Sequence, residues 1–213
     1  SRDRSRRGCC RYRGPTRTAA LGSSRHPMPP LQVSTFFALL AIIAGVGAVA
    51  IVGIQVVWRG SQRLGVLRDT QWQNAMLGAS IVALVATLGS LYLSEVAHFI
   101  PCNMCWYQRI AMYPIGPMLL FAWFRRDASI KPYVMLVAVG GALVSTYHVL
   151  LEIFPSLESS TTCGLVASCS TRWVEPLGIY TIPRMALSGF VAIIAALTLV
   201  RTPPVSSPET ALH

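Results

Sequence analysis

The feature that most constrains this chain is Val33–Val57, a run of 25 residues without one charged side chain. About 20 mostly apolar residues in helical conformation span a bilayer. Four further segments of this kind follow: Asn74–Ala97, Trp106–Phe124, Tyr133–Phe154 and Ile182–Val200. Only 12% of the residues are charged, against about 25% in soluble domains. We therefore predict an all-α integral membrane protein with five transmembrane helices, one of them N-terminal to the other four.

The basic residues of the connecting segments predict the orientation. They gather after the first segment, between the third and fourth, and after the fifth, as Arg59, Arg63, Arg68, Arg125, Arg126, Lys131 and Arg201. These three places share one side if all five segments cross, and Lys and Arg in short loops favour the cytoplasmic side. Residues 95–105 and 155–181 are then extracytoplasmic.

The first 27 residues hold eight arginines against one aspartate. Such a tail, without apolar periodicity, is typical of disorder, and no folded or aromatic feature supports nucleic-acid binding. Five crossings would place this charge outside, against the other loops. Since the first methionine is Met28, we expect a non-native tail and a start near Met28. The alternatives are that the first segment is a cleaved signal or lies along the interface.

We accordingly divide the chain into four parts. Residues 1–32 are expected to form a basic tail, 33–57 the first transmembrane helix, 74–201 the other four helices, and 202–213 a disordered C-terminal tail.

Four of the six cysteines form two closely spaced pairs. Cys102 and Cys105 make a C-x-x-C, and Cys163 and Cys169 make a C-x5-C; Cys9 and Cys10 lie in the tail and receive no role. Both pairs fall on the extracytoplasmic side, where disulfides persist. We expect Cys105 to precede a helix whose N-terminus stabilises a thiolate. Arg109 lies four residues on, on the same helix face and about 6 Å along the axis.

Other interpretations of these residues stay open at this point. The four thiolates could hold zinc or copper, or the pairs could be two structural disulfides. Arg109 costs up to about 3.5 kcal/mol at the centre of a bilayer, so it either reaches out to the interface or anchors a polar or anionic head group. His148, one helical turn before Glu152, is either an interfacial histidine or part of a site.

One stretch resembles a known signature. The run from Pro101 to Ile110, PCNMCWYQRI, is similar to that of the DsbB/BdbC family of disulfide-bond formation membrane proteins. Further resemblance lies in YHVLLE from Tyr147, in Cys163 to Cys169, and in IPRMALSGF from Ile182. The short C-x5-C is closer to the BdbC branch. In the vitamin K epoxide reductase family the loop pair comes before the C-x-x-C, which is the opposite order.

The resemblance implies a four-helix transmembrane bundle, here residues 74–201, plus one additional N-terminal transmembrane helix that the minimal family lacks. It also implies a protein-disulfide:quinone oxidoreductase. Cys163 and Cys169 would exchange with an extracytoplasmic thioredoxin-fold thiol oxidase of the DsbA/BdbD kind. Cys102 and Cys105 would pass the electrons to a membrane quinone, either menaquinone or ubiquinone, with Cys105 as the sulfur that faces it. Arg109, and with a weaker assignment His148, would bind the quinone, and no resident metal is expected.

Overall fold

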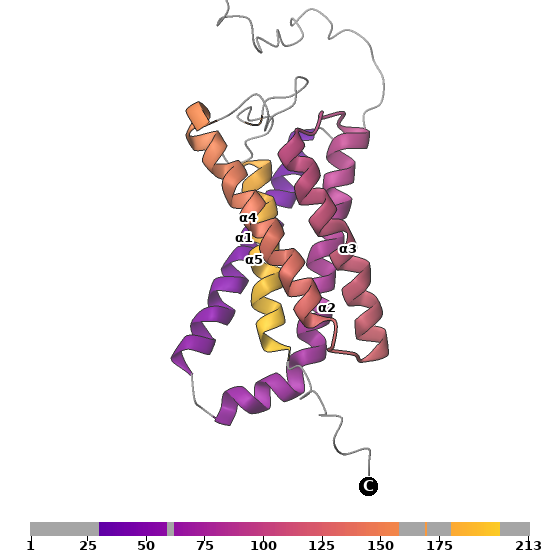
Figure 1. Cartoon of the computed structure of the whole chain (residues 1–213), viewed down its shortest axis with the longest axis vertical. Helices are drawn as coiled ribbons and strands as arrows, with labels where there is room; N and C mark the ends of the chain where they lie inside the picture. The colour runs from indigo at the N-terminus through magenta and orange to yellow at the C-terminus, as the bar shows by residue number, and fades with distance from the viewer. Residues whose placement is uncertain (1–29, 59–61, 158–168, 170–179, 201–213) are drawn as a thin grey trace, which may run out of the picture.

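The computed structural model describes residues 30–58, 62–157, 169 and 180–200 of the chain (Figure 1). Residues 1–29 of the predicted N-terminal tail, the predicted C-terminal tail, Cys163 and most of the segment 155–181 lie outside the described residues. Within the described part there are five long helices and no strand. The helices are α1 (Pro30–Val57), α2 (Gln62–Leu91), α3 (Asn103–Arg125), α4 (Lys131–Ile153) and α5 (Ile182–Leu199).

Four of these helices contain a stretch long and apolar enough to cross a membrane: Gln32–Val57, Gln71–Val96, Lys131–Ile153 and Ile182–Leu199. The fifth, α3, is more polar because it contains Gln108, Arg109 and Arg125. Its 23 residues still give a length of about 34 Å, enough for a hydrocarbon core of about 30 Å. Figure 1 shows α3 beside the other helices of the bundle. The fold prediction, a four-helix bundle with one additional N-terminal helix in a membrane protein, is confirmed.

Four helix starts differ from the sequence prediction, and the largest difference is at α2. The segment 59–70 was expected to be a connecting loop, but α2 begins at Gln62. That expectation was wrong because charge was taken as a loop signal, whereas Gln, Arg and Leu are good helix formers and the stretch contains no proline. In Figure 1 the first turns of α2 slant across the lower end of the molecule before the helix joins the bundle. Helices α1 and α3 start at Pro30 and Asn103, each three residues before the predicted boundary, and α4 starts at Lys131, two residues before it.

The core of the bundle lies between α2, α3, α4 and α5. Small residues on α2, such as Ala79 and Ala83, pack with larger apolar side chains on α3 and α5. The buried residues of this cluster include Met76, Ala79, Ala83, Met112, Ile115, Leu119, Phe190, Ile193 and Leu197. Small residues allow transmembrane helices to approach closely. Helices α4 and α5 approach so closely at Gly141 that an added methyl group there would overlap Cε1 and Cζ of the Phe190 ring.

The chain changes direction sharply between α2 and α3. Helix α2 runs directly into a π-helical turn, η1 (Tyr92–Val96), in which the Ala97 N–H donates to the Tyr92 carbonyl at 3.0 Å. His98 then takes a left-handed conformation with φ of 56°, which is uncommon outside glycine. This turn brings the chain back to Cys102 at the start of α3.

Candidate active site

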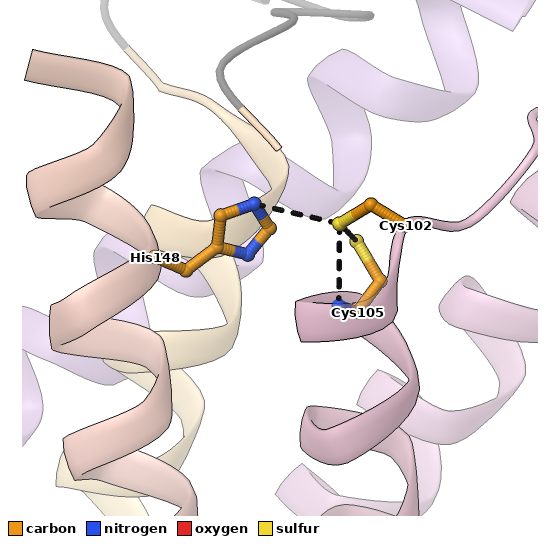
Figure 2. A group of neighbouring side chains, drawn as sticks. All are labelled: Cys102, Cys105 and His148. Carbon is orange, nitrogen blue, oxygen red and sulfur yellow. Dashed lines mark hydrogen bonds between the residues drawn. The ribbon is translucent and has the colours of Figure 1, made fainter. Parts of the chain in front are cut away.

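Cys102 and Cys105 lie together at the N-terminal end of α3 (Figure 2). Cys102 is the N-cap residue, and its sulfur accepts a hydrogen bond from the Cys105 backbone N–H at 3.4 Å. The two sulfurs are free thiols 3.2 Å apart, so one of them hydrogen-bonds to the other. The helix therefore begins at Asn103 and includes Cys105, and the capping position belongs to Cys102.

This position favours the charged form of Cys102. A hydrogen bond from the Cys105 side chain lowers the pKa of Cys102 to about 4, against its burial, which raises it. The neighbouring His148 lowers the pKa further, by hydrogen bonding and by charge, and so does the backbone of Cys105. The reduced pair thus shares a single proton at neutral pH, with the negative charge on Cys102 at the helix N-terminus.

His148, on α4, connects three parts of the site. Its Nε2 lies 3.7 Å from the Cys102 sulfur and 3.2 Å from the Cys169 carbonyl oxygen. Its Nδ1 lies 3.2 Å from Nε2 of Gln108 on α3. An amide nitrogen can only donate, so Nδ1 accepts and Nε2 carries a hydrogen. The hydrogen on Nε2 therefore points toward the cysteines.

Cys169 is the described member of the second pair, and it lies beside the first pair. It is disulfide-bonded and 1% exposed, in an apolar cluster with Cys102, Met104 and Leu151. Cys163 lies outside the described residues. The structure thus brings together Cys102, Cys105 and His148 from the predicted set, with Cys169 in contact through its backbone.

Arg109 lies one turn below Cys105 and faces the same space. Its Nη2 donates to the Ser90 carbonyl of α2 at 3.1 Å, and its guanidinium lies 5.3 Å from the centre of the Trp106 ring. These two contacts hold the side chain between α2 and α3. Because a guanidinium has five N–H groups, Arg109 can still donate a hydrogen bond to a further acceptor.

A cavity of about 380 Å³ adjoins all of these side chains. One part of its wall is polar and includes Cys102, Cys105, Arg109, His148 and Cys169 together with Gln108 and Glu152. The remainder is mostly apolar and comes mainly from α1, α2 and α5, including Leu40, Val85, Ala186 and Phe190. Such a cavity suits a flat amphiphilic molecule whose polar atoms face the cysteines and whose apolar part faces the bundle.

Two buried polar residues of this site were missed from the sequence. Gln108 is 5% exposed and bonds to His148, which lies 40 residues away. Glu152 is also 5% exposed, lines the cavity and accepts a hydrogen bond from Thr181 Oγ1 at 2.7 Å. Gln108 precedes Arg109 in the motif, and Glu152 follows His148 by one turn. Their positions were the only available signal, since nothing in the sequence gives their contacts across helices.

Comparison with known proteins gives consistent matches. The family model described as "Disulfide bond formation protein DsbB" matches residues 72–200. "Disulfide bond formation protein C" of Bacillus subtilis is 42% identical over 121 residues, which make up 57% of this chain and 88% of the relative. "Probable disulfide formation protein C" of Halalkalibacterium halodurans is 38% identical over 131 residues, 61% of this chain and 95% of the relative. No solved structure matches significantly.

The matched residues include α3, α4, α5 and both cysteine pairs. They contain the free thiols of Cys102 and Cys105 beside the disulfide-bonded Cys169. The chain therefore belongs to the DsbB family of disulfide bond formation proteins.

Proposed function

We propose that this membrane oxidoreductase takes electrons from a thioredoxin-fold thiol oxidase at the Cys163–Cys169 pair and passes them through Cys102–Cys105 to a membrane quinone. One observation carries the proposal. Cys102, Cys105, Cys169 and Arg109 all line the same cavity, whose remaining wall is mostly apolar. A redox pair, a second cysteine and an adjoining apolar cavity are the parts that such a relay needs.

The thiol steps follow from thiolate attack on disulfide sulfurs. A thiolate of the reduced partner attacks Cys163, and its second thiol resolves the mixed disulfide, which leaves Cys163 and Cys169 reduced. Cys169 then attacks Cys102, forming a Cys169–Cys102 bond and releasing Cys105 as a thiolate. Attack of Cys163 on Cys169 restores the second disulfide and releases Cys102. This end state has two free C-x-x-C thiols and an oxidised Cys169, as the structure has them.

Burial supports this division of labour within the pairs. Cys169 and Cys102 are 1% and 6% exposed and share an apolar cluster, so a water-borne partner would reach neither directly. We therefore assign attack by the partner to Cys163. Cys105 is only partly buried and lines the cavity one turn above Arg109. We assign to Cys105 the transfer of electrons toward the cavity, with its proton passing to the Cys102 thiolate as it reacts.

The residues present fit a quinone. Its ring would supply a two-electron acceptor that can also take two protons. Arg109, held by Ser90 and Trp106, would orient a carbonyl oxygen and stabilise negative charge there. His148, with its hydrogen on Nε2 through Gln108, would stabilise the Cys102 thiolate. The apolar wall excludes water from the same space.

Sidedness and compartment are part of the proposal. Cys102 and the α3–α4 turn with Arg125, Arg126 and Lys131 lie at opposite ends of α3. The basic turn favours the cytoplasm, so we place both cysteine pairs on the extracytoplasmic side of the cell membrane. A secreted thiol oxidase would meet the second pair there, in an oxidising compartment.

The test separates the two pairs. Purified protein would be assayed for quinone reduction with a reduced DsbA/BdbD-like oxidase, and separately for reoxidation of Cys102 and Cys105 by quinone. Cys163→Ser should abolish oxidation of the partner and preserve reoxidation of the first pair. Cys9→Ser is the matched control and should change neither. Loss of first-pair reoxidation in a folded Cys163→Ser protein would contradict the order of the relay.

One observation favours a second candidate, a metal site. Ligand atoms of Cys102, Cys105 and His148 lie within 4.8 Å of one another. The four-thiolate arrangement is disfavoured because Cys169 is disulfide-bonded and offers no thiolate in that state. Stoichiometric zinc or copper in purified protein that reduces no quinone would establish this alternative.

A further inference from the structure

Helix α1 lies outside the part of the chain that defines the family. The family match begins at residue 72, whereas α1 ends at Val57. Every face of α1 is apolar, and its outer face includes Val46 and Val49, which are 64% and 71% exposed. A helix needed only to cross the membrane would have no reason to contribute to the redox site. The contacts of α1 therefore require an explanation.

Contacts near both ends fix α1 against the bundle. Near the C-terminal end, Gln55 Nε2 donates to Thr198 Oγ1 of α5 at 2.7 Å. In the middle, Ala48 packs in a cluster with Ala192 and Ala195 of α5. Near the N-terminal end, the Phe37 ring lies directly over Gly89 of α2, where an added methyl group would be 2.9 Å from Cε1. A hydrogen bond between helices inside a membrane stabilises a defined packing.

Helix α1 also forms part of the cavity wall next to the cysteines. Phe37, Leu40, Ala41, Ile43 and Ala44 line the same cavity as Cys105 and Arg109. They stand opposite residues of α2 and α5, and none of them carries a charge. The cavity is therefore polar at the cysteine end and apolar where α1 closes it.

A second cavity continues this space toward the other end of the bundle. It measures about 270 Å³ and is lined only by residues of α1, α2 and α5. Ala44 of α1 and Val82 of α2 line both cavities. On α1 the combined lining runs from Phe37 to Ile51, which is roughly 21 Å at 1.5 Å per residue. The two cavities together form an apolar groove that starts at the redox site.

We propose that this groove, bounded by α1, α2 and α5, binds the polyisoprenoid tail of the quinone. The proposal rests on the proposed function and adds a binding subsite to it. Continuity with the cysteines identifies the occupant, because a molecule with its ring at Arg109 and Cys105 must place its tail in the adjoining apolar space. A phospholipid acyl chain has matching apolar character but no reason to begin at the redox site. Helix α1 thus makes this protein bind tailed quinones more tightly than ring-only quinones.

Binding of tailed and ring-only quinones by matched variants of the full-length protein tests this proposal. Ala44→Phe fills the point where the two cavities meet. Ala50→Phe is the control, since Ala50 lies on α1, is exposed and lines neither cavity. Tryptophan fluorescence quenching would give the dissociation constants of a polyprenylated quinone and of the same ring without a tail. Quinone retained after detergent extraction gives a second readout that does not depend on turnover.

Ala44→Phe should weaken binding of the tailed quinone by about 5- to 100-fold, the cost of overfilling a packed site. Binding of the ring alone should stay within about twofold, as should both affinities in Ala50→Phe. Retained quinone should fall only in Ala44→Phe. If that protein does not fold, Ala196→Phe, on α5 in the second cavity, provides the same test.

Equal affinities of the wild-type protein for the tailed and the ring-only quinone would overturn the groove and leave the proposed function standing. Unchanged tailed-quinone binding in folded Ala44→Phe protein would overturn it too, as would an equal loss for both ligands. Failure of the wild-type protein to reduce any quinone would instead refute the proposed function on which the groove rests.

Discussion

Replacing Gly141 by alanine tests the tightest helix contact in the bundle. The new methyl group would overlap Cε1 and Cζ of Phe190 and lie 2.9 Å from Cδ1. Phe190 is fully buried, so its ring cannot swing into lipid. Overpacking of this kind costs about 1–3 kcal/mol. The higher helix propensity of alanine offsets about 1 kcal/mol of this cost. We therefore expect the free energy of unfolding of Gly141→Ala to be lower by up to about 2 kcal/mol.

The neighbouring glycine provides the control. A methyl group at Gly140 would meet nothing within 4 Å, so Gly140→Ala should be neutral or slightly stabilised. Both variants would be unfolded by denaturant titration in detergent micelles. Because Phe190 also lines the cavity, Gly141→Ala should weaken quinone binding as well, whereas Gly140→Ala should not. Equal stability of the two variants would refute this account of how α4 and α5 pack.

Three further predictions concern the site. The ultraviolet absorbance of the Cys102 thiolate should persist down to a pH near its pKa of about 4 and vanish below it. In His148→Ala the absorbance should be lost at a higher pH. An unchanged titration would show that His148 does not stabilise the thiolate. Arg109→Ala should reduce quinone affinity or turnover by about 10- to 150-fold, and Arg109→Lys should restore only part of it. The control, Arg125→Ala at the other end of α3, should be normal in stopped-flow quinone reduction. In reduced spheroplasts an impermeant maleimide should label Cys105. A cysteine introduced by Ser129→Cys should react only after permeabilisation. The reverse pattern would invert the proposed orientation.

Features encoded locally could be predicted from the sequence. The uncharged length of Val33–Val57 predicts a spanning helix, and α1 covers it. The C-x-x-C spacing predicts neighbouring thiols near a helix start, and the structure has them there. The position of that start was less clear, because cysteine is not a usual N-cap residue. Placing the cap at Cys102 moves the helix-stabilised charge from Cys105 to Cys102.

Contacts between distant helices could not be predicted. The bond between Gln108 and His148 joins α3 and α4 across 40 residues, and no pattern in one sequence encodes such a pair. The role of α1 was hidden for a different reason. All of its faces are apolar, so periodicity does not reveal which face meets α5 and which meets lipid. Its position against the cavity depends on particular contacts, such as the Phe37 ring over Gly89.

The single hydrogen on His148 Nε2 has a consequence for how the second cysteine pair is held. It has two acceptors within reach, the Cys169 carbonyl at 3.2 Å and the Cys102 sulfur at 3.7 Å. A sulfur in a disulfide is a weak acceptor, so the hydrogen then stays with the carbonyl and helps hold Cys169 against the first pair. A thiolate is a far stronger acceptor, yet with both C-x-x-C thiols free the contact to the Cys169 carbonyl is still the shorter of the two. His148 is therefore placed to share its hydrogen between the Cys102 thiolate and the Cys169 backbone, which keeps the second pair beside the first after the electrons have arrived.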